Sequence, residues 1–180
     1  LTESPTGIKT YATVSGTVER KQDSLVITND KTDSTMNSED AVSSIEDLKK
    51  DEIINVCQTL GISFENRLIV NKLKTNSKIL VVNGMDIEPY QLNNNYLFQD
   101  NVKNLLETIN LLSRRFNLDS YLLLSKYDDN NVMAVKSLIS TYSNINFIVV
   151  NDVFPKNTNG FIAKKYFNEY KLEEILFLDT

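Results

Sequence analysis

Apolar and polar residues alternate in blocks through the second half of the chain. Four short apolar runs have the length of buried strands: Ile79–Val82, Tyr121–Leu124, Ile145–Val150 and Ile175–Leu178. Amphipathic stretches separate these runs. Continuous apolar strands between amphipathic helices are typical of a parallel sheet whose two faces are covered by helices. The pattern therefore predicts an α/β domain with a mainly parallel, Rossmann-like sheet.

The helices of this domain are predicted from apolar residues that recur every three or four positions. The stripes run from Phe98 to Phe116, from Val132 to Tyr142 and from Phe161 to Tyr170. Asp128 and Asp129 precede the second stripe, where aspartate is a typical N-cap residue.

A further helix is predicted before the first strand. Ser43 and Glu46 have the spacing of a capping box, and Gly61 is placed to end the helix. Cys57 falls on its apolar face, which favours a buried structural thiol over a reactive one.

The N-terminal part has a different pattern. In its first 28 residues, the β-branched runs Tyr11–Val14 and Thr17-Val18 flank the turn signal Ser15-Gly16, and Ser24–Thr28 forms a second run. Residues 29–42 are polar and acidic, which is typical of a solvated linker. The predicted organisation is a β segment at 1–28, a flexible linker at 29–42 and an α/β domain at 43–180.

Composition limits the function further. The chain has 180 residues, of which 41% are hydrophobic, enough for a sizeable core. No apolar run approaches the roughly 20 residues of a membrane span, and no signal peptide is visible. Because the first residue is Leu1 rather than Met, we expect a fragment of a longer protein.

Charge and residue types exclude several classes of function. The net charge of −5 argues against nucleic acid as a partner. Cys57 is the single cysteine, so the chain forms no internal disulfide and holds no iron–sulfur cluster, which fits a reducing, cytoplasmic compartment. The chain has no histidine, and no metal-ligand spacing or catalytic triad is recognisable. We therefore expect no catalytic residue and no metal site.

The loop after the first strand carries the candidate chemistry. Asn83, Gly84, Asp86, Glu88 and Tyr90 place carboxylates, an amide and a phenol at the end of the Ile79–Val82 strand. In open parallel sheets, ligands bind beyond the carboxyl ends of the strands. Asn-Gly permits a tight turn with positive φ. Two interpretations stay open from the residues: a ligand site, or an ordinary polar turn.

The ends of the next two strands carry weaker signals. The second strand is followed by Ser125–Asn130, where Asp128 and Asp129 are typical of a helix N-cap, and the third by Asn151–Gly160, where Asn157–Gly160 is typical of a turn. No GxGxxG or Walker-type loop occurs in the chain.

Several segments together resemble the C subunit of the Rnf electron-transport complex. Ala12–Val18 resembles its "ASVSGxV", Ser24–Asp30 its "IVIEND", and Ile79–Tyr90 its "LIINGxECEPY". The flavin subunit of respiratory complex I has the related "NADExEP". Phe154-Pro155 stands where the family has "YPSGGEKQ". Proline reductase-associated electron transfer proteins are similar, and the resemblance covers nearly the whole chain.

The resemblance implies a fold and a set of cofactors. It implies a small barrel-sandwich-like β segment before an α/β core that binds FMN and receives electrons from NADH. It also implies 4Fe–4S clusters in the parent beyond Thr180. The partners would be redox proteins or other domains of the parent, in the cytoplasm or peripheral to the inner face of the membrane.

The chain departs from the family at its ligand-binding elements. The family's "GxGGAGFPT" corresponds to Thr59–Asn66, which has one glycine, and its "DDR" to Asn94–Tyr96. Its "SGGEK" corresponds to Lys156–Gly160, without the glycine pair. Glycines let backbone N–H groups approach a phosphate closely. We therefore expect no cofactor bound tightly in this chain, and a weak or vestigial site at Asn83, Gly84, Asp86, Glu88 and Tyr90.

Three functions remain as hypotheses. The first is a scaffold or docking domain of an electron-transfer protein, not catalytic alone. The second is an active FMN-dependent NADH oxidoreductase domain, in which Asn83, Asp86 and Glu88 would contact the flavin or nicotinamide and Lys72 or Lys74 would neutralise phosphate. The third is a module that binds another small ligand in the same cleft.

Overall fold

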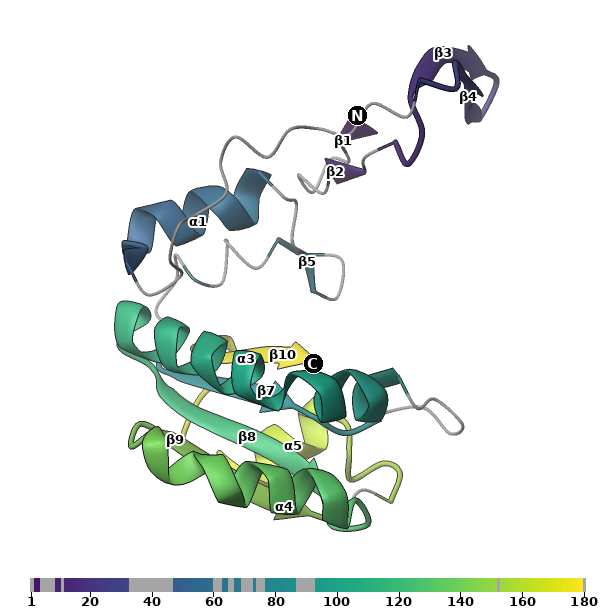
Figure 1. Ribbon diagram of the computed structural model, residues 1–180. Helices are drawn as coiled ribbons and strands as arrows, with labels where there is room; N and C mark the ends of the chain where they lie inside the picture. The colour runs from purple at the N-terminus through teal and green to yellow at the C-terminus, as the bar shows by residue number, and fades with distance from the viewer. Residues whose placement is uncertain are drawn as a thin grey trace. The chain divides into compact units, whose positions relative to one another are not determined.

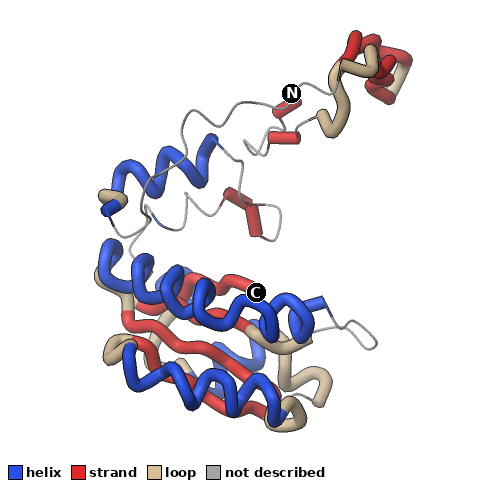
Figure 2. Tube along the Cα trace, in the orientation of Figure 1, coloured by secondary structure: helices blue, strands red, loops and turns tan. Residues whose placement is uncertain are grey.

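The computed structural model describes residues 2–3, 9–10, 12–32, 47–59, 63–64, 67–68, 73, 77–86, 93–151 and 153–179 (Figure 1). The chain divides into two compact units, Leu1–Ile69 and Val70–Thr180. Helices and strands alternate through the second unit, as Figure 2 shows.

A four-stranded parallel sheet forms the centre of the second unit. Its strands are β7 (Ile79–Asn83), β8 (Asp119–Ser125), β9 (Ile145–Val150) and β10 (Ile175–Asp179), in the order β10-β7-β8-β9. All five residues of β7 are buried, as expected for an interior strand of a covered parallel sheet. All four strands were predicted, and the predicted fold class, an α/β protein with a small N-terminal β segment, is confirmed.

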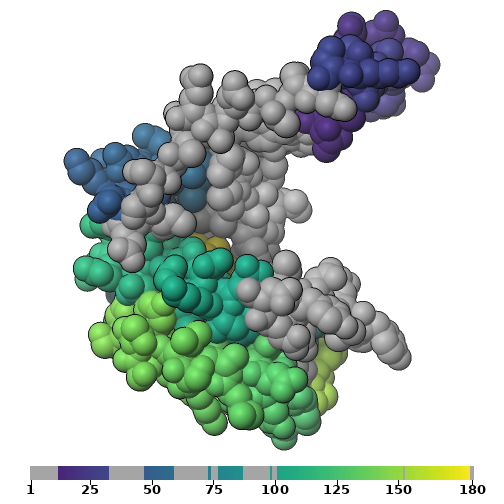
Figure 3. Space-filling view, in the orientation of Figure 1, coloured from purple at the N-terminus to yellow at the C-terminus, as the bar shows by residue number. Residues whose placement is uncertain are grey.

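Helices lie on both faces of the sheet. Figure 1 shows α3 (Asn93–Phe116) and α4 (Asp129–Leu138) in front of the sheet and α5 (Asn159–Tyr166) behind it. From the front, the side chains of α3 and α4 cover the sheet (Figure 3). A 3₁₀ turn, Ile139–Thr141, continues α4, and another, Leu172–Glu174, leads into β10.

The helix α3 packs through the predicted apolar stripe. Phe98, Val102, Leu106 and Ile109 recur every three or four residues, and each is at most 6% exposed. The helix is kinked at Asn101 (φ −131°, ψ 16°). It ends at Phe116, and the next residue, Asn117, has the left-handed φ of 53° that is typical just after a helix C-terminus.

The other two helices are shorter than their apolar stripes. In α4, the Asp128 side chain accepts a hydrogen bond from the Asn131 N–H (3.2 Å), which confirms the predicted N-cap. The helix α5 begins at Asn159, so Asn159 and Gly160 are helical although they were predicted to lie in a turn. It buries Ile162, and Phe167 beyond its end meets Tyr121 of β8 edge-to-face at 4.8 Å between ring centroids.

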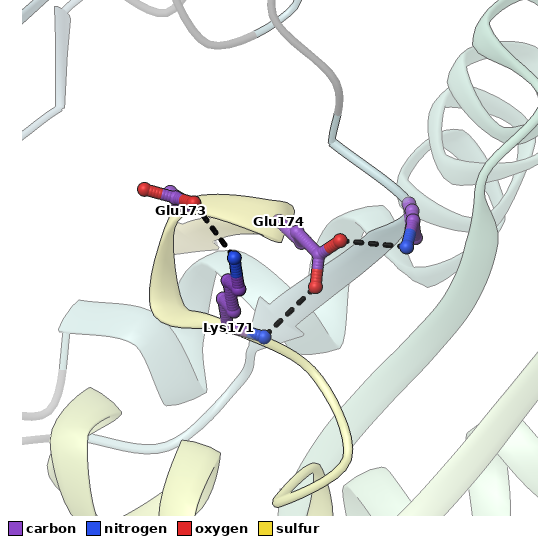
Figure 4. A network of polar contacts seen from close by, with 4 residues as sticks. Lys171, Glu173 and Glu174 are labelled. Carbon is purple, nitrogen blue, oxygen red and sulfur yellow. Dashed lines mark hydrogen bonds and ion pairs between the residues drawn. The ribbon is translucent and has the colours of Figure 1, made fainter.

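The beginnings of β7 and β10 are tied together by Lys78 and Glu174. The Lys78 N–H donates to the Glu174 carbonyl (2.8 Å), and the Lys78 ammonium lies 2.6 Å from Glu174 Oε1. Glu174 Oε2 accepts from the Lys171 N–H (2.9 Å), while Glu173 reaches the Lys171 ammonium at 4.0 Å (Figure 4). The Lys78 ammonium and then the Lys171 N–H hold the pKa of Glu174 below its usual value, and the same contact raises the pKa of Lys78.

The first unit contains short antiparallel pairs. β1 (Thr2–Glu3) pairs with β2 (Lys9–Thr10), β3 (Gly16–Lys21) with β4 (Ser24–Asn29), and β5 (Ser63–Phe64) with β6 (Arg67–Leu68). The longest pair confirms a β segment before residue 30. Ala12–Val14, however, is not a strand, although a β run was predicted at 11–14.

The β3–β4 hairpin has little core of its own. Val18 is 53% exposed, Leu25 is 50% exposed, and Ile27 is half-buried. A two-stranded hairpin is at best marginally stable alone in water. Gly16 is required by close approach, since a Cβ there would lie 1.9 Å from the Thr28 carbonyl oxygen.

The helix of the first unit, α1 (Lys50–Thr59), begins later than predicted. Ser43 and Glu46 lie outside the described residues, and Leu48 and Lys49 are not helical. Glu52 accepts a hydrogen bond from the Lys49 N–H (2.6 Å). This is one half of a capping box, and it lies six positions after the predicted pair Ser43 and Glu46. The predicted linker at 29–42 falls mostly outside the described residues and stays a prediction.

Candidate functional site

The strand order puts the candidate site at the switch point of the sheet. From β7 the chain proceeds to β8 and β9, and it then returns to β10 on the other side of β7. In such sheets the ligand crevice lies where this direction reverses, beyond the carboxyl ends of the strands. The carboxyl end of β7 is Asn83, which pairs with Asp179 at the end of β10. The loop selected from the sequence therefore lies where the fold rule places a ligand.

Gly84 follows β7 and fits tightly between its neighbours. Its N–H donates to the Leu123 carbonyl of β8 (2.9 Å). A Cβ at this position would lie 2.9 Å from the same oxygen and 3.3 Å from the Phe98 ring. Gly84 does not have the positive φ that the Asn-Gly pair suggested. Glycine is needed here because β8 and α3 leave no room for a side chain.

The Asn83 side chain holds the turn that follows it. The residue is completely buried, and its Oδ1 accepts a hydrogen bond from the Met85 N–H (3.1 Å). This is the Asx-type bond by which asparagine fixes a turn. Met85 itself is 1% exposed. The amide that was expected to face a ligand thus acts within the protein.

Asn157, in the segment between β9 and α5, completes this arrangement. It is 4% exposed, and its Nδ2 donates to the Asp86 carbonyl (3.2 Å). Its own carbonyl lies 3.5 Å from Asn83 Nδ2, at the outer limit of a hydrogen bond. Asn157 was predicted only as part of a turn. The signal that could have identified it was an amide beyond the third strand, at the same edge of the sheet as Asn83.

The two remaining predicted site residues cannot be placed. Glu88 and Tyr90 lie outside the described residues, as do Lys72 and Lys74, and they stay predictions. Asp86, which precedes Glu88 and Tyr90 in the same loop, is described and is half-buried. The structure therefore brings Asn83, Gly84 and Asp86 together with Asn157.

A second polar cluster lies at the ends of β8 and β9. The Tyr127 hydroxyl donates to Asn151 Oδ1 (3.0 Å), and the Tyr127 N–H donates to Ser125 Oγ (3.0 Å). The Lys126 ammonium lies 4.9 Å from the centre of the Tyr127 ring, within cation–π range. Tyr127 is 64% exposed, and Phe154 in the segment after β9 is 69% exposed. The Tyr127 cluster therefore presents a phenol and an ammonium to solvent.

Other chemistry is sparse in the described part of the chain. No group of three or more acidic, cysteine or histidine side chains there could hold a metal ion. Burial raises the pKa of the Cys57 thiol above its usual 9.0, so this half-buried thiol is protonated at neutral pH and weakly nucleophilic. None of the helices described is both long enough and apolar enough to cross a membrane.

The fold and site together define a Rossmann-like α/β domain with a polar switch point. In comparisons with known proteins, the chain matches no family model and no curated protein sequence.

Proposed function

We propose that the chain is a scaffold or docking domain of an electron-transfer protein similar to the Rnf C subunit. In this proposal the domain positions redox groups carried elsewhere in the parent, and it does not itself hold FMN or NADH tightly. The resemblance of Ile79–Tyr90 and of the N-terminal β segment to that family supports the electron-transfer part.

The arrangement of the two N–H groups after β7 supports the loss of the cofactor site. A phosphate is bound by several backbone N–H groups that point outward at one anion. Here the Gly84 N–H is engaged by the Leu123 carbonyl and the Met85 N–H by the Asn83 side chain. Both donors are used inside the protein, so neither of these two N–H groups is available to bind an anion.

Thermal unfolding with FMN tests this part of the proposal. A ligand at 100 times its dissociation constant stabilises a protein by about 2.7 kcal/mol. We expect no rise in Tm at millimolar FMN and no quenching of flavin fluorescence. A clear rise together with quenching would favour the alternative of an active FMN-dependent NADH oxidoreductase domain.

The electron-transfer part has a separate test in the parent protein. We expect cysteine runs with ferredoxin-type spacing in the sequence after Thr180, because two-cluster ferredoxins hold 4Fe–4S clusters by such runs. A parent without cluster-binding cysteines would contradict the electron-transfer role even if the fold is shared.

The cluster at Tyr127 favours a second candidate, a module that binds a small ligand. Its exposed phenol ring and the Lys126 ammonium could hold an anionic ring compound by stacking and charge. The proposal is tested by titrating aromatic carboxylates and nucleotides. Tyr127→Ala should weaken any such binding about tenfold, whereas Tyr142→Ala, at the end of the 3₁₀ turn after α4, should leave affinity unchanged.

A further inference from the structure

The strand β9 has one unpaired edge. It is the last strand of the order β10-β7-β8-β9, and among the described residues no other strand pairs with it on its outer side. Unpaired edges are templates for strand addition, and proteins usually protect them with lysine, proline or a bulge. β9 has the sequence Ile-Asn-Phe-Ile-Val-Val and pairs with β8 without a bulge. From Tyr142 to Asn151 the chain has neither a charged residue nor a proline.

The register of the sheet identifies the free backbone groups. The Val150 carbonyl accepts from the Lys126 N–H, and Val150 is paired with Ser125. In a parallel ladder, alternate residues direct both of their backbone groups to the same neighbour. Val150, Ile148 and Asn146 therefore bond to β8, while Val149, Phe147 and Ile145 direct theirs outward. The Ile145 N–H is already engaged by the Tyr142 carbonyl (3.2 Å).

We propose that this edge pairs with the β9 edge of a second copy, antiparallel, about a two-fold axis at Ile148. In this register Phe147 lies opposite Val149 of the other copy. The outward N–H and C=O groups of both residues then all find partners in the other copy. A register centred on Phe147 would instead pair Val149 with Ile145, whose N–H is already used.

The side chains also fit a second copy. Antiparallel pairing about Ile148 sets Phe147 beside Val149 twice, and aromatic with β-branched pairs stabilise sheets. Val149 is 41% exposed, and Phe147 and Ile148 are half-buried, so all three have surface left to cover. Residues 142–151 carry no charge, so this segment itself brings no like charges together when two copies of a chain with net charge −5 meet.

The area that this strand pairing would bury limits the affinity of the dimer. Stable interfaces bury about 1,200–2,000 Å² in total, and one strand pair of six residues covers less than that. The dimer should therefore be weak, with a dissociation constant on the order of 10 µM to 1 mM.

Sedimentation equilibrium of the full chain tests the pairing. Between about 10 µM and 1 mM we expect a monomer–dimer equilibrium. Val149→Lys, which places charges at the edge, should weaken dimerisation at least tenfold. Met133→Lys is the matched control, because Met133 is 68% exposed and lies on α4 rather than on β9. This variant should dimerise as the wild type does. Circular dichroism establishes that both variants are folded.

Disulfide trapping tests the register independently. In a Cys57→Ser background, Ile148→Cys should give a covalent dimer under mild oxidation. The two copies of residue 148 would form a non-hydrogen-bonded antiparallel pair, in which the Cα atoms lie about 4.5 Å apart, within the range of a disulfide. Asn146→Cys should not, since the two copies of residue 146 would lie about 13 Å apart along the strand. A chain that stays monomeric at 1 mM, or a dimer insensitive to Val149→Lys, would overturn the proposal. In that case the β9 edge would pair with a strand of another protein or stay unpaired.

Discussion

Asn157 donates a hydrogen bond from its side-chain amide to the backbone carbonyl of Asp86, 71 positions earlier in the chain, at 3.2 Å. This bond joins the segment after β9 to the turn after β7. Together with the bond from the Met85 N–H to Asn83, it fixes the switch point of the sheet from within the protein.

Asn157→Ala should destabilise the protein by about 1–2 kcal/mol, because the Asp86 carbonyl would lose a partner in a partly buried position. The measurement is the free energy of unfolding in urea. Asn130→Ala, at an exposed position in the first turn of α4, serves as control and should change it by less than about 0.5 kcal/mol. Equal effects of the two substitutions would mean that the Asn157 bond does not hold the loop.

Two glycine substitutions should have opposite effects. Gly84→Ala places a Cβ 2.9 Å from the Leu123 carbonyl oxygen and 3.3 Å from the Phe98 ring. Overpacking of this kind costs about 1–3 kcal/mol. A Cβ on Gly160 meets nothing within 4 Å, and Gly160 is helical, so Gly160→Ala should stabilise by about 0.5–1 kcal/mol. Urea unfolding of both variants measures the difference, and a neutral Gly84→Ala would refute the tight fit.

Two buried serines should also differ. Ser120 Oγ in β8 is fully buried and has no hydrogen-bond partner among the described residues, whereas Ser113 Oγ donates to the Leu118 carbonyl (2.7 Å). Ser120→Ala removes an unsatisfied polar group and should be neutral or stabilising by up to about 1 kcal/mol. Ser113→Ala should cost about 1 kcal/mol. Thermal unfolding distinguishes them, and a larger loss for Ser120→Ala would show that its hydroxyl has a partner.

The Lys78–Glu174 contact should make stability depend on pH. The folded-state pKa of Glu174 lies below its usual 4.5. The contribution of Glu174 to the free energy of unfolding is therefore present above pH 4.5 and is lost as the pH falls through the lowered value. The pKa of Lys78 is raised, so its contribution is present below pH 10.5 and is lost as the pH rises through the raised value. Glu174→Gln should therefore show a shallower loss of stability on acidification than the wild type.

Glu173→Gln is the matched control for this pH dependence. The Glu173 side chain is 79% exposed and lies 4.0 Å from the Lys171 ammonium. Its variant should follow the wild-type curve of unfolding free energy between pH 2 and pH 6. If the Glu173 and Glu174 variants show the same curve, the Lys78 contact does not contribute to acid sensitivity.

Local periodicity predicted the elements of the second unit, because strands such as Ile145–Val150 and the stripe of α3 depend on neighbours in sequence. The roles of Gly84 and Asn157 could not be predicted in the same way. Gly84 is required by Leu123 and Phe98, and Asn157 acts on Asp86, all distant in sequence. The start of α1 was missed because Ser43 and Glu46 gave a plausible cap, while the cap described uses Glu52.

Isothermal titration of the full chain with FMN and, separately, with NADH tests the central claim most directly, namely that the switch point is closed by the protein's own amides. Since the Gly84 and Met85 N–H groups are engaged internally, we predict no saturable binding of either ligand up to about 100 µM. A dissociation constant of about 1 µM or below, equivalent to about −8 kcal/mol, for either ligand would contradict the account.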